Sequence, residues 1–304
     1  MPILKINNFT LVNKDKKIID NLNLVFEENR FYTVFGLSGS AKTILRDSIF
    51  NLLPEDFERK KGDIFFKEDS VFSNSSHKKK ILSVFTNSET VFNENYKVGV
   101  QLKDILFLNK IYTDKAEFKK DLQYYLDLLD IDEKFMNFYP YEIDRKTLIK
   151  ISFILPVMFK PDILIIDDSL HKADTLTNNL IYLYLKKVKE NMTIVFFTSV
   201  NNILSELSDE IIYLYNGRIL EKFKVKQGLK FKHPYRELFE NKKVFNSETS
   251  FVNNGNNLDL TDNSKRCIYY DMCPLRTKKC LDFDNKLIEY EKEHFISCLN
   301  LTED

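Results

Sequence analysis

The stretch FYTVFGLSGSAKT, residues 31–43, joins a short apolar run to a loop of small residues. The run is rich in β-formers and predicts a buried strand over 31–35, while the amphipathic segment TILRDSIFNLL (43–53) predicts a helix. The loop between them differs from the phosphate-binding pattern GxxxxGK[ST] by a single methyl group, at Ala41. A strand before the loop and a helix after it form the context that this pattern requires.

The loop supplies a candidate residue for each part of a phosphate site. Lys42 can reach the outer phosphates of a nucleotide, Thr43 can hold Mg²⁺, and the helix that follows offers its positive end. The backbone N–H groups that can surround phosphate oxygens belong to Gly36, Ser38, Gly39, Ser40 and Ala41. The alternative is a Gly/Ser-rich turn without a ligand. Ala41 supports that alternative, because a β-carbon restricts the backbone where glycine is usual.

Before this loop, alternating apolar positions in residues 3–12 and 17–27 predict an antiparallel pair of strands. After it, residues 98–160 repeat apolar positions at helical spacing and predict an inserted helical subdomain. Buried-strand runs return at DILIID (162–167) and TIVFFT (193–198), with a helical stretch between them. This alternation is typical of a parallel sheet in an α/β fold.

The C-terminal third divides into three parts. IIYLY and GRILEKF predict a hairpin that turns at Asn216-Gly217. Residues 241–265 are polar and Asn-rich and predict a linker, and residues 266–304 predict a small module with four cysteines. The expected domains are therefore 1–240, with its helical insertion at about 98–160, then 241–265 and 266–304.

Bulk properties exclude several classes of protein. The 304 residues carry 45 Lys and Arg against 45 Asp and Glu, so no global field attracts nucleic acid. The N-terminus lacks the pattern of a secretory signal, and no apolar run approaches the roughly 20 residues that span a bilayer. We therefore expect a cytoplasmic chain whose cysteines are free thiols or metal ligands, and which reaches a membrane only through a partner.

Four stretches carry a resemblance to a known family. They are KVGVQLKDIL (97–106), FYPYEIDRKTLIKISFILPVMFKPDILIIDD (138–168), LSDEIIYLYNGRILE (207–221) and KHPYRELFE (232–240). With them, residues 1 to about 240 resemble the ATP-binding subunits of ATP-binding cassette (ABC) importers for oligopeptides and dipeptides. The resemblance implies a P-loop NTPase fold of ABC ATPase type, with a mixed sheet core, an antiparallel β lid and the helical insertion. It also implies ATP and Mg²⁺ as ligands, with Asp167 as the Walker B aspartate.

The same resemblance shows which family residues are replaced. The signature LSGG, which contacts the nucleotide of a partner subunit, is replaced by Ile143-Asp144-Arg145-Lys146. Three hydrolytic positions carry Asp168 in place of the glutamate, Ser199 in place of the switch histidine and Thr86 in place of the Q-loop glutamine. The D-loop keeps Asp174, and the aromatic residue that stacks on adenine aligns near Asn13. Because phosphoryl transfer depends on positioned charges and a positioned base, we expect weak hydrolysis or none.

The resemblance further implies a place in a transporter. The expected partners are a second ABC ATPase subunit in a heterodimer, transmembrane permease subunits and, indirectly, an extracellular peptide-binding protein, with no nucleic acid. The chain would lie at the cytoplasmic face of the membrane, with peptide or nickel as cargo. The alternative is a non-catalytic pseudo-ATPase that acts as a scaffold or regulator. A soluble ABC ATPase of translation or DNA repair would predict tandem cassettes or a coiled-coil insertion, and neither is visible in the sequence.

Cys267, Cys273, Cys280 and Cys298 have five, six and seventeen residues between successive members. Thiolates are the ligands of iron–sulfur clusters, and this spacing resembles the tail of the same importers, some of which bind a [4Fe–4S] cluster there. A Cys₄ zinc site and four reduced thiols are the alternatives. His233 and His294 are expected to be structural.

Overall fold

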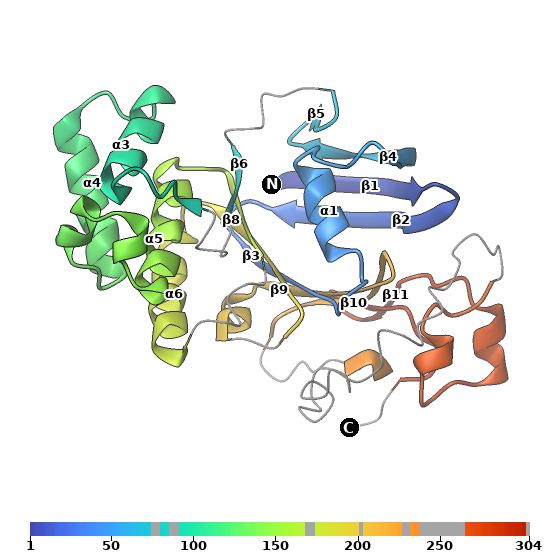
Figure 1. The fold of residues 1–304 in the computed structure, drawn as a ribbon. Helices are drawn as coiled ribbons and strands as arrows, with labels where there is room; N and C mark the ends of the chain where they lie inside the picture. Colours follow the sequence, from blue (N-terminus) through green and yellow to red (C-terminus); the bar gives the residue numbers. More distant parts are fainter. Residues whose placement is uncertain are drawn as a thin grey trace.

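The computed structural model describes residues 1–73, 80–84, 91–167, 174–200, 203–226, 232–236 and 265–301 (Figure 1). Its strands are β1 (Pro2–Asn13), β2 (Lys16–Glu27), β3 (Phe31–Phe35), β4 (Phe57–Phe66), β5 (Asp69–Ser70), β6 (Ile81–Val84), β7 (Ile163–Ile166), β8 (Thr193–Thr198), β9 (Glu210–Tyr215), β10 (Arg218–Lys224), β11 (Ile288–Glu291) and β12 (His294–Ile296). Its α-helices are α1 (Lys42–Ile49), α3 (Val98–Leu108), α4 (Lys115–Leu128), α5 (Arg145–Met158) and α6 (Thr175–Val188).

The strands form two sheets. The smaller is antiparallel, with the order β2-β1-β4-β5, and it contains the N-terminal strand pair predicted from the alternating pattern. The larger has the order β11-β12-β10-β9-β3-β8-β7-β6 and is parallel from β9 to β6. The mixed sheet expected for the core is therefore confirmed.

Alternation along the central strands divides the core into two layers. Leu164 and Ile166 of β7 pack with the helices α3 to α6, whereas Ile163 and Ile165 pack with α1 and the smaller sheet. α1 lies between the two sheets (Figure 1) and contributes Leu45 to that second layer. β3, which precedes the phosphate loop, is covered in the same way, since Phe31 packs in the first layer and Tyr32 and Val34 pack in the second.

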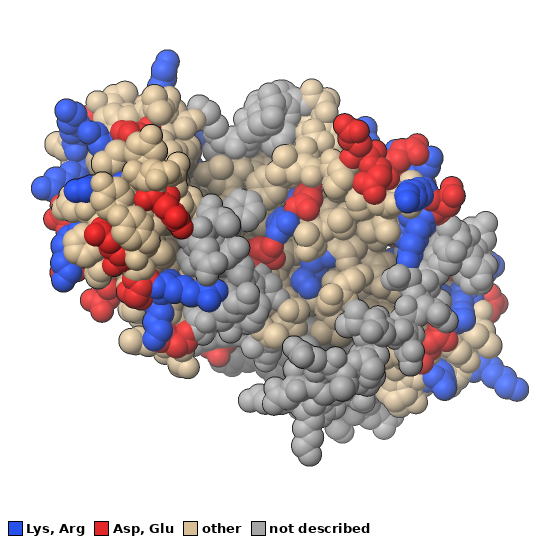
Figure 2. Space-filling model, in the orientation of Figure 1, with Lys and Arg blue, Asp and Glu red and all other residues tan. Residues whose placement is uncertain are grey.

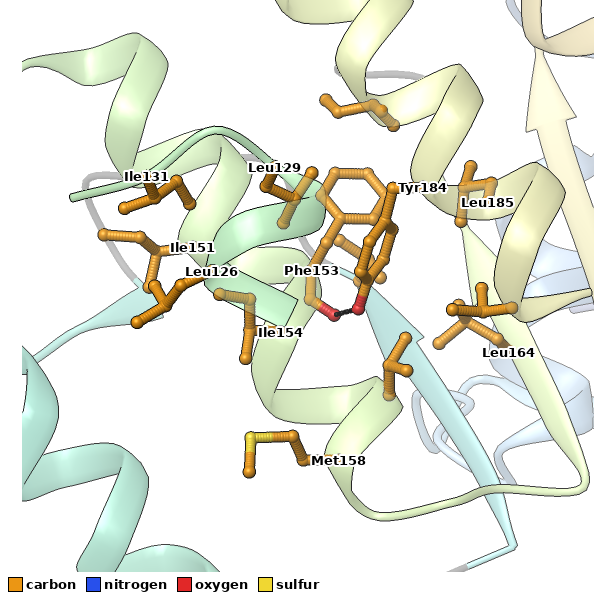
Figure 3. Packing of buried hydrophobic residues seen from close by; sticks show 14 of the residues in the cluster. Leu126, Leu129, Ile131, Ile151, Phe153, Ile154, Met158, Leu164, Tyr184 and Leu185 are labelled. Atoms are coloured by element: carbon orange, nitrogen blue, oxygen red, sulfur yellow. Dashed lines mark hydrogen bonds between the residues drawn. The ribbon is translucent and has the colours of Figure 1, made fainter. Parts of the chain in front are cut away.

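The helices at residues 98–158 form a packed group on one side of the main sheet (Figure 1). Its contact with α6 includes a polar pair in an apolar setting, since the buried Tyr184 hydroxyl donates to the Phe153 carbonyl at 3.2 Å (Figure 3). A buried hydroxyl without a partner would cost free energy, so this hydrogen bond favours one alignment of α5 against α6. No helix of the described residues is both long and apolar enough to cross a membrane.

The C-terminal residues join the main sheet. β12 pairs antiparallel with β10, where Glu221 lies opposite Ile296, and β11 pairs with β12. The fully buried Glu221 carboxylate accepts from the backbone N–H of His233 at 2.7 Å and contacts His294 Nε2 at 2.6 Å. Both histidines therefore lie in a buried structural contact at this joint. The predicted linker, except for residue 265, lies outside the described residues.

Candidate functional site

The loop from Gly36 to Thr43 leaves the carboxyl end of β3 and enters α1, as the sequence predicts. Its residues Leu37 to Thr43 line a cavity of about 440 Å³. The other residues that line this cavity are Lys16, Lys17, Ile18, Ile44, Phe57 and Asn216. The predicted phosphate-loop residues are therefore brought together around one pocket, and two further lysines contribute positive charge to it.

Ala41 has a left-handed backbone, with φ of 72°, and is the residue immediately before α1. Glycine takes this conformation without steric cost, whereas alanine does not. Gly39 is also left-handed, with φ of 80°. A β-carbon on Gly36 would lie 2.8 Å from the Leu214 carbonyl oxygen, so only glycine fits there. The loop therefore has the left-handed backbone conformations that favour glycine, although alanine stands in place of one glycine of the pattern.

Lys42 folds back over its own loop. Its Nζ donates to the Gly36 carbonyl and lies 3.4 Å from the Leu37 carbonyl. A phosphate group would offer the ammonium stronger, charge-assisted hydrogen bonds than these carbonyl oxygens do. The Lys42 side chain, which the motif assigns to the outer phosphates, thus contacts backbone carbonyls of its own loop.

The loop is also tied to the C-terminal part of the chain. The Leu37 N–H donates to the Tyr235 hydroxyl at 3.1 Å. Burial raises the pKa of Tyr235, so the phenol stays neutral. The Tyr235 ring contacts the Tyr269 ring with centroids 5.5 Å apart. Tyr235 was not predicted as a site residue, because its contact with the loop spans 198 positions of the sequence.

Asp167 follows β7, as expected for a Walker B aspartate, and it is held by an arginine. Its Oδ2 accepts from Nη1 of Arg46, which lies one helical turn after Thr43 on α1. Thr43 is exposed at the pocket, so its hydroxyl is accessible to a ligand. Mg²⁺ would need the Asp167 carboxylate as well, and the guanidinium already uses one of its oxygens. Mg²⁺ at this carboxylate would therefore displace Arg46 or share Asp167 with it.

Ser199 follows β8 at the same edge of the sheet. The Gly36 N–H donates to the carbonyl of the preceding Thr198 at 3.0 Å, so Ser199 is close to the phosphate loop along the sheet edge. A serine hydroxyl cannot carry the positive charge of a protonated imidazole. Thr86 and Asp168 lie outside the described residues.

The residues at the signature position act in helix capping and ion pairing. Asp144 caps α5 by accepting from the Thr147 N–H at 3.1 Å. Lys146 Nζ lies 2.5 Å from Asp174 Oδ2, and Asp174 in turn caps α6 through the Thr177 N–H at 2.9 Å. Hydrogen bonds from Lys146 and Thr177 lower the pKa of Asp174.

Asn13, where the adenine-stacking residue aligns, instead donates through Nδ2 to Asp56 at 2.6 Å. Phe57 lies opposite Asn13 in the β1–β4 register and lines the pocket. An aromatic ring in the pocket wall can stack on a nucleobase. The sequence pattern did not indicate Phe57, because it lies 44 positions after Asn13 and becomes its neighbour only in the sheet.

The four cysteines are gathered in one region without forming a metal site. Cys267, Cys273 and Cys280 are buried in a shared apolar cluster, and Cys298 is half-buried. Burial raises the pKa of Cys298 to about 12 and also raises the pKa of Cys267. Across the described ranges, no group of three or more His, Cys, Asp or Glu side chains could hold a metal ion. The iron–sulfur expectation is therefore not supported.

Charged side chains of both signs are interspersed on the face drawn in Figure 2. The neutral balance of the sequence is thus reflected on this face.

Comparisons with known proteins agree on the class of fold. No family model matches the chain. It is 22% identical over 238 residues to the oligopeptide transport ATP-binding protein OppD of Lactococcus lactis, covering 75% of this chain and 70% of that protein. It is 22% identical over 303 residues to the dipeptide transport ATP-binding protein DppF of Haemophilus influenzae, covering 94% and 89%. A solved ATP-binding subunit of an ABC transporter superposes with a TM-score of 0.64 at 17% identity, covering 73% of this chain and 90% of that one.

Proposed function

Since the homologues of this chain are ATP-binding subunits of ABC transporters, we propose that it is the nucleotide-binding subunit of an importer for oligopeptides or dipeptides. An ABC ATPase fold implies binding of ATP and Mg²⁺. The observation that carries the proposal is the loop that joins β3 to α1, whose residues Leu37 to Thr43 line a pocket, with Lys42 at the first position of the helix.

We test the phosphate site by titrating a fluorescent ATP analogue against wild type and Lys42→Ala. Lys42 is the fixed cation of the loop, so its removal should weaken binding by roughly tenfold or more. Lys120→Ala, an exposed lysine on α4, is the matched control and should bind as wild type does. Equal affinities for wild type and Lys42→Ala would refute a phosphate role for the loop.

In this proposal the chain hydrolyses ATP weakly or not at all. Asp168, Ser199 and Thr86 are poorer substitutes for the glutamate, histidine and glutamine of the family, so the water and the γ-phosphate lack their usual partners. The pairing of Lys146 with Asp174 supports the same view. It commits a residue of the signature position to an ion pair within the chain.

The ion pair between Lys146 and Asp174 also favours a second candidate, a pseudo-ATPase that binds nucleotide and braces the transporter without turnover. Single-turnover hydrolysis with the partner ATPase chain separates the two functions. A burst of product at this chain's own site would exclude the scaffold. Co-purification with the products of neighbouring genes would identify the second ATPase and the permeases, and transport assays would distinguish peptide from nickel.

The metal content of the C-terminal module is a separate question. Iron, sulfide and zinc analysis of anaerobically purified protein, combined with thiol titration, distinguishes a cluster on the four cysteines from a zinc site or free thiols. None of the three outcomes changes the proposed role of residues 1–240.

A further inference from the structure

Arg46 is held from two sides at the edge of the phosphate site. Its Nη1 donates to Asp167, while its Nε and Nη2 lie 2.9 and 2.8 Å from Oδ1 of Asp47. Because guanidinium nitrogens have a fixed planar arrangement, the two contacts with Asp47 fix the orientation in which the third reaches Asp167.

This ion pair is partly shielded from water. The Arg46 side chain is 14% exposed and the Asp167 side chain 30% exposed. Ion pairs of fully exposed residues contribute little, because water and salt screen them, and partial burial increases the interaction. The ion pair between Arg46 and Asp167 is therefore screened less than an ion pair between fully exposed residues.

Arg46 places a positive charge beside Asp167, as Mg²⁺ does beside a Walker B aspartate. The carboxylate needs a cation beside it, since an unpaired Asp167 would repel the phosphates of a nucleotide bound at Gly36 to Thr43. Here a side chain of the chain itself supplies that cation. A divalent ion at the same carboxylate would have to displace the guanidinium or lie beside a like charge.

We propose that Arg46 substitutes for Mg²⁺ at Asp167, so that this site binds nucleotides without requiring a divalent cation. The inference rests on the proposed nucleotide site and adds one property of that site, namely that nucleotide binding does not depend on Mg²⁺. It is carried by the contacts of Arg46 with Asp47 and Asp167 and by the place of Arg46 on α1, one turn after Thr43.

The decisive experiment uses the unmodified protein. The affinities for a fluorescent ADP and a fluorescent ATP analogue are measured in excess Mg²⁺ and in excess EDTA at matched ionic strength. We expect the two affinities for each nucleotide to differ by less than about threefold, well under the tenfold that corresponds to 1.4 kcal/mol. If binding is lost or falls by tenfold or more in EDTA, the pair yields to Mg²⁺ and the inference is wrong, while the proposed nucleotide site stands.

Arg46→Leu tests whether the guanidinium is the cause. Without the guanidinium, the Asp167 oxygen that accepts from Arg46 can bind a metal ion instead, so nucleotide binding should become dependent on Mg²⁺ by roughly tenfold or more. The double variant Arg46→Leu/Asp167→Asn should lose that dependence again, because no carboxylate then needs a cation. Arg30→Leu, which removes an arginine paired with Glu27, is the matched control and should bind as wild type does in both conditions.

Thermal unfolding of each variant shows whether it is folded before binding is measured. The comparison of wild type in Mg²⁺ and in EDTA needs no variant. If Arg46→Leu binds equally well in both conditions, Arg46 is not the substitute for Mg²⁺. If wild type binds no nucleotide in either condition, the proposed function fails, and this inference fails with it.

Discussion

Ala41, which immediately precedes α1, combines a left-handed backbone with a β-carbon. For L-residues this conformation costs roughly 1–2 kcal/mol relative to glycine. The loop tolerates the strain because the elements on either side of it are buried, with Phe35 and Leu45 almost fully covered. A single methyl group thus lowers stability without changing the fold.

Ala41→Gly should therefore raise the free energy of unfolding by about 1 kcal/mol, after allowance for the greater freedom of glycine in the unfolded chain. Urea denaturation measures the change. Ala116→Gly is the matched control, since Ala116 lies in the first turn of α4 with ordinary helical geometry and should be destabilised by about 0.5–1 kcal/mol. If Ala41→Gly lowers the free energy of unfolding as Ala116→Gly does, the backbone of Ala41 is not strained.

At the scale of single elements, α5 begins at the family's signature position. Asp144 is exposed and caps the helix through the Thr147 N–H, so part of the altered signature serves the helix itself. Burial acts to raise the pKa of Asp144, and the hydrogen bonds from Thr147 outweigh it, so that the net pKa is lowered.

Asp144→Ala should lower the free energy of unfolding by about 1 kcal/mol, because the orphan N–H groups of the helix lose their acceptor. Asp144→Ser should stay close to wild type, since serine caps nearly as well as aspartate, and it also restores the serine of the family signature. Chemical denaturation of the three proteins measures both effects. A similar loss in both variants would mean that Asp144 stabilises the chain by its charge and not by capping.

At the scale of the whole molecule, hydrolysis depends on residues that come from different segments and, in the proposed heterodimer, from two chains. The isolated chain should turn over ATP more slowly than roughly 1 per second, the lower edge of ordinary enzymes. Asp168→Glu alone should not restore turnover, because Thr86, Ser199 and the signature position remain altered.

A phosphate-release assay on purified protein checks this, with Lys42→Ala as the control for contaminating ATPases. Turnover well above that rate in wild type, and absent from Lys42→Ala, would refute the proposal that the chain is a weak enzyme. Restoration by Asp168→Glu would instead show that one methylene group is the main defect.

The sequence alone determined the order of the elements around the phosphate loop, since strand and helix periodicity and the GxxxxGK[ST] spacing are local properties of the chain. It also predicted Lys42 and Thr43 as phosphate-loop residues from the motif and Asp167 from the family resemblance, and their shared role stays a prediction. Thr86 and Asp168 stay predictions of the sequence, as they lie outside the described residues.

Only the tertiary structure decided which side chains meet at that edge. Arg46 contacts Asp167 across 121 positions of sequence, and Tyr235 reaches Leu37 across 198. The cysteines have the spacing of a metal-binding tail, and the structure buries three of them in one apolar cluster, which the spacing did not indicate. Local patterns determine whether a segment forms a helix, a strand or a loop. Contacts between distant segments depend on how the layers pack, and the number of residues between two segments does not say whether they come together in space.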